Sequence, residues 1–159
     1  MGIVRAFAAI DTEPVGLIVS SCTHELRMIY APKPDAGTDA GSVFQSRHRS
    51  SRIVAVDDAG TIAGVAECVG RVAALYVQGI AVAPTHRRCG VATDLLAHCA
   101  SLAASAELPF LEIATIKETG NVEIFLRLGF VVIDERVSER FWSYDRQPVT
   151  EVTLRRCAV

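Results

Sequence analysis

The residues with the clearest chemical potential form a short basic turn between two apolar segments. Arg87 and Arg88 stand side by side, and Gly90 follows two residues later. An apolar run over residues 75–82 precedes the turn and is typical of a strand, whereas residues 91–106 have the periodicity of a helix. A turn that opens a helix directs unpaired backbone N–H groups outward, where the helix dipole adds partial positive charge. Such a turn favours anions, phosphates above all, and Gly90 lets a ligand approach the backbone closely.

The segments around this turn alternate between strand-like and helix-like patterns, which is typical of an α/β domain. Two strand-like segments, residues 73–82 and 110–116, flank one helix, so we expect parallel neighbours joined by a right-handed crossover. We expect a single domain over residues 1–159, with a mixed, mostly antiparallel sheet and helices on both faces. The patterns predict helices over residues 12–22, 91–106 and 119–128, and strands over residues 3–9, 53–56, 61–72, 73–82, 110–116, 130–137 and 149–156.

Local signals mark the ends and irregularities of these elements. Asp11 or Thr12 is expected to cap the first helix. Gly79 interrupts a strand, which often marks a bulge or a close backbone approach. Gly129 is expected to end a helix in a left-handed conformation, with Phe130 folded back onto that helix. The helix after the basic turn has one apolar face, formed by Val91, Ala92, Leu95, Leu96, Cys99, Leu102, Ala103 and Ala106.

Residues 31–51 have the composition of a loop, because Pro, Gly, Asp, Ser and Thr interrupt every apolar run. Residues 43–45 could add one helical turn. A mobile surface loop is one interpretation, and a lid or acceptor-recognition loop is the other. A later segment that contains Phe141, Trp142 and Tyr144 is expected to connect the last two strands.

Composition narrows the classes of function. The chain has 159 residues, of which 50% are hydrophobic, and a formal net charge of −2. A protein that binds nucleic acid through phosphates is normally basic, so we expect no nucleic-acid partner. No apolar run is long enough to span a membrane, and the N-terminal residues lack the apolar region of a secretory signal. Five cysteines without zinc-ligand spacing favour reduced thiols, no metal site and a cytoplasmic location.

The basic turn belongs to a longer pattern. Three elements carry it: residues 87–92, which fit Arg/Gln-x-x-Gly-x-Gly/Ala; the preceding Val82-x-Pro84; and the downstream Asn121…Phe125-x-x-x-Gly129-Phe130. With the order strand, turn, helix, these elements resemble the Gcn5-related N-acetyltransferase (GNAT) superfamily over about residues 52–137. The resemblance implies that the two parallel strands of the sheet splay apart.

The resemblance also implies that acetyl-coenzyme A (acetyl-CoA) is the co-substrate. Backbone N–H groups at the helix start would surround its pyrophosphate, and its pantetheine arm would lie between the splayed strands. A backbone N–H of residues 80–82 would polarise the thioester carbonyl. Asn121 would reach the cofactor and is also a natural helix cap. The implied cofactor-binding residues are Ile80, Ala81, Val82, Arg87, Arg88, Cys89, Gly90, Val91, Ala92, Thr93, Asn121 and Phe125.

The implied reaction moves an acetyl group to a primary amine of a small-molecule or peptide acceptor, by direct attack in a ternary complex. It needs a base for the amine and an acid for the thiolate. Many family members have a tyrosine as the acid at the position of Phe125, which cannot donate a proton. The candidate catalytic residues are Glu67, Tyr76 and Tyr144, the last because the family often shapes its acceptor pocket there. A solvated edge carboxylate and a packing aromatic are the alternative roles for Glu67 and Tyr144.

Three functions stay open at this point. The first is an N-acetyltransferase. The second is a non-catalytic domain that binds or senses acyl-CoA, which Phe125 and the absence of an obvious base favour. The third is an α/β interaction module whose turn binds another phosphate compound. A homodimer is compatible with the resemblance, and the turn says nothing about the acceptor.

Overall fold

The computed structural model describes residues 2–35 and 50–159. Within these residues, eight strands form one sheet in the order β1-β3-β4-β5-β6-β8-β7-β2. The strands are β1 (Ile3–Ala6), β2 (Tyr30–Pro32), β3 (Ser50–Val56), β4 (Ile62–Gly70), β5 (Ala74–Val82), β6 (Phe110–Ile116), β7 (Val131–Ser143) and β8 (Pro148–Cys157). The α-helices are α1 (Thr12–Arg27), α3 (Val91–Ser105) and α4 (Asn121–Arg127).

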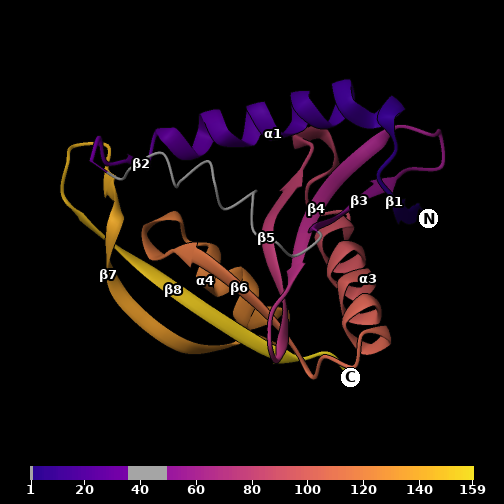
Figure 1. The fold of residues 1–159 in the computed structure, drawn as a ribbon. Coiled ribbons are helices and arrows are strands. Elements are labelled where there is room, and N and C mark those ends of the chain that lie inside the picture. Colours follow the sequence, from indigo (N-terminus) through magenta and orange to yellow (C-terminus); the bar gives the residue numbers. More distant parts are fainter. Residues whose placement is uncertain (1, 36–49) are drawn as a thin grey trace.

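Helices cover both faces of this sheet. Figure 1 shows α1 across one face, and α3 and α4 on the other. Among the described strands, β5 and β6 pair in parallel and all other neighbours pair antiparallel. The predicted fold class is therefore confirmed, including the parallel pair around the helix that follows the basic turn.

Each face has its own apolar core. Under α3 and α4 the core includes Leu95, Leu96, Cys99 and Ala103 of α3, all of which lie on the predicted apolar face. Under α1 a smaller core contains Val15 and Ile18, the two buried residues of that helix, packed against strand valines and isoleucines. Burial of each apolar helix face against the sheet supplies the main free energy that fixes these helices.

The last turn of α4 also follows the sequence prediction. Gly129 has φ +87°, and the N–H of Phe130 donates to the carbonyl of Phe125 at 3.1 Å. The two phenylalanine rings meet edge to face with centroids 5.8 Å apart. The left-handed glycine therefore ends the helix and brings Phe130 back onto it.

Several parts of the chain differ from the sequence prediction. The first strand ends at Ala6 and not at residue 9, because residues 9–11 form a 3₁₀ turn, and α1 continues past residue 22 to Arg27. Phe141 and Trp142 do not lie in a connection, because β7 runs through to Ser143. Residues 30–32 form β2, which pairs with this end of β7, so the expected loop begins later than residue 31. Residues 138–140 of β7 are Ser, Glu and Arg, so they interrupt the apolar pattern, which predicted this strand only as far as residue 137. The remaining proposals for the loop, including the helical turn at residues 43–45, fall outside the described residues.

The start of α1 is held by a buried carboxylate. Asp11 accepts hydrogen bonds from the Arg5 guanidinium at 2.7 and 2.9 Å and from the backbone N–H of Ala8 at 2.8 Å. Arg5 lies in β1, so the contact ties the edge strand to the helix. The hydrogen bonds from Arg5 are the main cause that lowers the pKa of Asp11 from 3.8 to about 2.

This pKa predicts a pH-dependent role for Asp11 in stability. A depressed pKa in the folded state stabilises the fold above the unfolded-state pKa, and the stabilisation disappears as pH falls towards the folded-state pKa. Asp11→Asn should therefore lower the midpoint of thermal unfolding at neutral pH. The difference from the wild type should shrink between about pH 4 and pH 2. Unfolding curves recorded across this range check the prediction, and a difference that does not change with pH would contradict it.

Candidate active site

The strands β5 and β6 lie side by side only in their first halves. They pair as far as Val77 and Ile113, although β5 continues to Val82 and β6 to Ile116. Among the described residues, no strand fills the gap that opens beyond this point. The gap is the splayed pair that the sequence predicted, and it forms a cleft of about 330 Å³. Its lining includes Tyr30, Tyr76, Ile80, Ala114, Thr119, Asn121, Phe125, Arg140 and Glu151.

A bulge in β5 lies at the rim of this cleft. Glu67 of β4 pairs with Gly79, but its neighbour Cys68 pairs with Val77, so Gln78 is an extra residue in β5. The bulge predicted from the glycine is confirmed. A bulge bends its strand and changes the direction of its backbone groups, and this one comes directly after the last pair between β5 and β6.

The turn after β5 has the geometry of an anion site. Arg88 and Gly90 have left-handed backbones, with φ +61° and +82°. No described side chain caps the N-terminus of α3, so the backbone N–H groups of its first turn are open to a ligand. A Cβ on Gly90 would meet no atom within 4 Å. No described part of the chain occupies the space beside Gly90, and its left-handed φ is a conformation that glycine adopts without strain.

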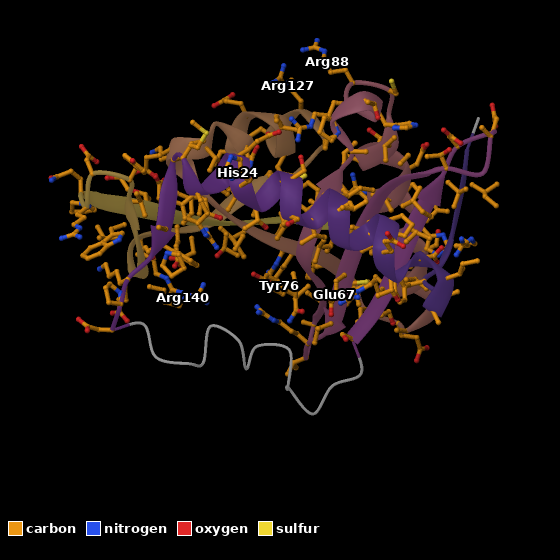
Figure 2. All side chains as sticks on the ribbon, turned by 90° about the horizontal axis from the view of Figure 1, so that it is seen from above. His24, Glu67, Tyr76, Arg88, Arg127 and Arg140 are labelled. Atoms are coloured by element: carbon orange, nitrogen blue, oxygen red, sulfur yellow. The ribbon has the colours of Figure 1, made fainter. Side chains whose placement is uncertain are left out.

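The two arginines of the turn have different roles. Arg87 donates to a carboxylate oxygen of Glu25 in α1 at 2.9 Å, and also contacts the Cys22 sulfur at 3.7 Å. The Glu25 contact is the main reason that the pKa of Arg87 is raised. Arg88 makes no ion pair with the described residues, and Figure 2 shows its side chain directed away from the fold. Arg88 is thus the cation of the pair that is available to an anion, while Arg87 joins the turn to α1.

His86 fixes the other side of the turn. Its Nε2 lies 3.0 Å from a carboxylate oxygen of Asp57, in the turn between β3 and β4. The same carboxylate accepts the backbone N–H groups of Ala59 and Thr61. The His86 contact is the largest cause that lowers the pKa of Asp57. His86 is therefore a positioning residue, and its partners hold the basic turn on the β3–β4 hairpin.

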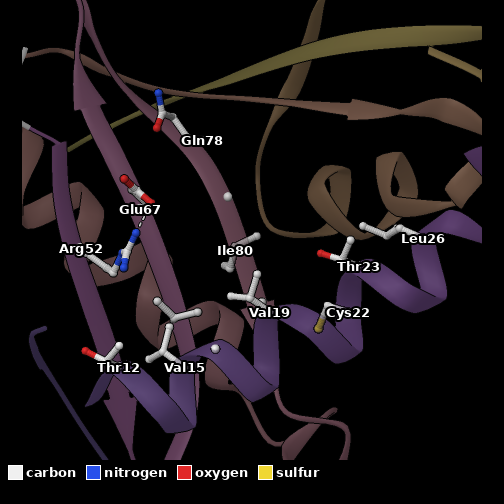
Figure 3. Close-up of a pocket in the computed structure, with 14 residues that line it drawn as sticks. Thr12, Val15, Val19, Cys22, Thr23, Leu26, Arg52, Glu67, Gln78 and Ile80 are labelled. Atoms are coloured by element: carbon white, nitrogen blue, oxygen red, sulfur yellow. Dashed lines mark hydrogen bonds and ion pairs between the residues drawn. The ribbon is translucent and has the colours of Figure 1, made fainter. Parts of the chain in front are cut away.

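A second cavity lies between α1 and the strands β3, β4 and β5 (Figure 3). Its volume is about 500 Å³, and most of its lining is apolar. Glu67 and Arg52 form an ion pair of 3.1 Å on its wall. Leu26, Gln78, Gly79 and Ile80 line both this cavity and the cleft. The two spaces therefore meet at the β5 bulge.

Comparison with known sequences identifies the family to which the chain belongs. The profile of the Acetyltransferase (GNAT) family matches residues 19–130, which is most of the chain. The chain belongs to this family. Members of the GNAT family catalyse acyl transfer, and acetyl-CoA is the co-substrate of the family.

Solved structures share the fold of this GNAT chain at low sequence identity. A GCN5-related N-acetyltransferase from Kribbella flavida has a TM-score of 0.75 and 21% identity, over 98% of this chain and 97% of its own. The ribosomal-protein-S18-alanine N-acetyltransferase from Escherichia coli has a TM-score of 0.71 and 15% identity, over 99% of this chain and 94% of its own. An aminoglycoside 6′-N-acetyltransferase complexed with coenzyme A has a TM-score of 0.72 and 10% identity, over 99% of this chain and 97% of its own. No curated protein sequence gives a match, and no described helix is long and apolar enough to cross a membrane.

In this GNAT protein, the sequence-predicted cofactor residues lie in three parts of the fold. Ile80, Ala81 and Val82 lie at the end of β5, where no strand pairs on the side of the gap. Residues 88–93 form the exposed turn and the first turn of α3. Asn121 is the first residue of α4 and lines the cleft. Of these residues, Ile80 and Asn121 line the cleft at the splayed strands, whereas the turn at residues 88–93 lies beyond the end of β5 and outside the lining of the cleft.

The aromatic residue at the family's acid position belongs to the core. Phe125 is 7% exposed, packs against Phe130 and lines the cleft with its remaining surface. Tyr76 lines the same cleft, and its ring lies under the Arg71 guanidinium, 3.6 Å from the centroid. Burial is the main cause that raises the pKa of Tyr76, so its hydroxyl keeps its proton at neutral pH. Tyr76 and Tyr30 are the two tyrosines in the described lining of this cleft, and Tyr76 is the one that lies on the splayed strand β5.

Tyr144, the third candidate for catalysis, lies apart from both spaces. It follows the end of β7, is 78% exposed and lines neither the cleft nor the cavity. Its backbone N–H donates to Ile29 at 3.0 Å. The residues that β7 brings to the cleft are Arg140 and Phe141.

Sequence reasoning missed a polar cluster in the cleft. Glu151 is 8% exposed and accepts a hydrogen bond from Ser138 at 2.7 Å, while Arg140 approaches at 3.5 Å and Arg136 at 3.4 Å. Burial alone would raise the pKa of Glu151, but Ser138 and the two arginines outweigh it, so the pKa is lowered. The one signal in the sequence was Glu151, which lies between Val149 and Val152 in a segment that otherwise has the pattern of an apolar strand.

Proposed function

We propose that this GNAT protein is an N-acetyltransferase that moves the acetyl group of acetyl-CoA to a primary amine by direct attack in a ternary complex. One observation carries the proposal: β5 has an open edge at the splayed gap and leads straight into an uncapped helix N-terminus. An extended arm with a phosphate group at its end needs such a strand edge followed by such an anion site.

The residues around the gap fit the donor. The N–H groups from Arg88 to Thr93 would hold its pyrophosphate, and Arg88 would add a full positive charge. The free backbone groups of residues 80–82 would pair with the pantetheine arm and polarise the thioester carbonyl. Acetyl-CoA supplies an acetyl group that is activated as a thioester. The acceptor would approach from the cavity beneath α1, because that cavity meets the cleft at the β5 bulge.

Two residues, one from the cavity and one from the cleft, would divide the proton transfers in the proposed reaction. Glu67 lines the cavity and pairs in register with Gly79, so its carboxylate would take the proton that the acceptor ammonium must lose. The amine nitrogen then forms the C–N bond as the C–S bond breaks, and the second proton that this nitrogen must lose would replace the one that Tyr76 gives to the sulfur. Tyr76 would donate a proton to the departing sulfur in place of the tyrosine that Phe125 replaces. The products are an amide and a free thiol.

The test combines binding with turnover. We expect acetyl-CoA to bind in isothermal titration calorimetry, and at least one primary amine to release thiol from it in a reaction followed with a thiol reagent. The amines should include amino acids, polyamines and peptides, so that the acceptor class does not decide the result. Absence of acetyl-CoA binding would overturn the proposal.

A sensing domain is the second candidate, and Phe125 is the observation that favours it. A domain that only binds acyl-CoA needs the open β5 edge and the basic turn but no acid. It would bind acetyl-CoA and release no thiol with any amine. The same experiment therefore separates the two functions.

A further inference from the structure

The cavity beneath α1 has the shape and chemistry of a pocket for one small molecule. Its volume of about 500 Å³ lies within the usual range of small-ligand pockets. Apolar side chains from both sides dominate its lining, and they are Val15, Val19, Leu26, Val65, Ile80 and Ala81. An apolar group of four or more carbons can leave water here and gain hydrophobic free energy.

One pair of opposite charges interrupts this apolar lining. Arg52 and Glu67 face each other in register on β3 and β4, and their side chains meet at 3.1 Å. Figure 3 shows the pair on the strands, with Val15 and Val19 of α1 nearby. The Glu67 side chain is 13% exposed and that of Arg52 is 41% exposed. A carboxylate and a guanidinium at this separation match an ammonium and a carboxylate that share one carbon atom.

The position of the pair relates it to the reaction. Glu67 is opposite Gly79, and Gly79 lines both the cavity and the cleft. Arg52 lies one strand further from the cleft. An ammonium at Glu67 would thus be nearer the splayed strands than a carboxylate at Arg52. This order is the one that an amine acceptor requires.

We propose that the acceptor is a free α-amino acid with an apolar side chain. Its ammonium binds Glu67, its carboxylate binds Arg52, and its side chain lies among the valines of α1 and β4. This inference rests on the proposed acetyl transfer and gives it a substrate class.

Acceptors with several positive charges fit the cavity poorly. Glu67 is the one carboxylate in the described lining of the cavity, and Arg52 already balances its charge. In the neighbouring cleft, Glu151 is already bonded to Ser138 and paired with Arg140. A polyamine or an aminoglycoside carries several ammonium groups, and each one needs a partner when it leaves water.

Four acceptors test the proposal in the thiol-release reaction: L-leucine, L-leucinamide, 3-methylbutylamine and spermidine. We expect kcat/KM for L-leucine to exceed that of each other amine by about tenfold or more. Equal or better turnover of L-leucinamide or spermidine would overturn the substrate class and leave the acetyl transfer intact. If no amine reacts, the proposed acetyl transfer is wrong. Binding of L-leucine, measured by calorimetry, then tests the amino-acid site by itself. Absence of that binding would then overturn it.

Arg52 variants test the role of the carboxylate site. Arg52→Gln should raise KM for L-leucine by about tenfold or more, because the substrate carboxylate loses its partner. KM for 3-methylbutylamine should change little, because this amine has no carboxylate. Arg52→Lys should restore part of the affinity for L-leucine. An equal rise in KM for both amines would mean that Arg52 acts only on the structure of the site.

A pair of variants on α1 tests the cavity. Val19 lines it and is 42% exposed, so Val19→Phe can fill the space without disturbing the core. We expect KM for L-leucine to rise about tenfold in this variant, with acetyl-CoA affinity unchanged. Leu17 lies on the same helix, is 68% exposed and does not line the cavity, so Leu17→Phe is the matched control. Unchanged KM in Val19→Phe would exclude the cavity as the acceptor site.

Discussion

Gly90→Val is expected to reduce the affinity for acetyl-CoA by about tenfold or more, which corresponds to about 1.4 kcal/mol. The new side chain would occupy the space above the first amides of α3, where the structure has no protein atom within 4 Å of a Cβ. A ligand phosphate could then no longer approach these N–H groups closely. Isothermal titration calorimetry with acetyl-CoA measures the change.

The control for this variant is Gly60→Val in the turn between β3 and β4. Gly60 has φ +83°, compared with +82° for Gly90, and a Cβ there also meets no atom within 4 Å. Both variants should therefore lose a similar free energy of folding, about 1–2 kcal/mol, from a side chain in the left-handed region. The loss of affinity should be confined to Gly90→Val. If the two variants lose the same affinity for acetyl-CoA, backbone strain explains the result, and the filling of the space proposed for the ligand does not.

Glu67→Gln is expected to lower kcat by about 100-fold, because an amide cannot take the proton of the acceptor ammonium. Affinity for acetyl-CoA should not change, since Glu67 lines the α1 cavity and not the cleft. Steady-state thiol release at saturating acceptor gives kcat, and calorimetry gives the affinity.

Glu112→Gln is the matched control for the loss of a carboxylate. Glu112 is also nearly buried, at 9% exposure, and it pairs with Arg155 and Arg71 on the strand next to Tyr76. It lines neither the cleft nor the cavity, so its replacement should lower stability and leave kcat within a few-fold. If the two variants lose the same kcat, Glu67 is not the base and the ion pair with Arg52 is its only role.

The sequence was informative where structure depends on near neighbours. The turn at Gly90 and the helix end at Gly129 depend on left-handed glycines, and a bulge lies next to Gly79, where the sequence pointed to an irregularity. The apolar face of α3 follows from periodicity. The parallel pair then follows from the order of the elements, so most of the donor side of the site was predictable.

The rest of the site depends on contacts between distant residues. Arg87 reaches Glu25, which is 62 residues away in the sequence, and no local pattern predicts this choice over a phosphate. Ser138 and Glu151 meet because β7 and β8 pair in a register that brings the two residues together. Most side chains of β7 are exposed, so no alternation of apolar and polar residues indicates this register in the sequence. The acceptor side of the site is built from such pairs, which is why the sequence left it open.

The contact between Arg87 and Glu25 has a consequence for how the two substrates affect each other. Arg87 belongs to the basic turn, whereas Glu25 belongs to the helix that roofs the α1 cavity. A ligand that binds the turn and competes for Arg87 would weaken the contact between Arg87 and Glu25. It would therefore change the stability of α1 above the cavity. Thermodynamic reciprocity then requires that a molecule in the cavity alter the affinity at the turn by the same factor. If a bound donor takes Arg87 from Glu25, this one surface ion pair would couple the proposed donor and acceptor sites, although no residue would need to touch both ligands.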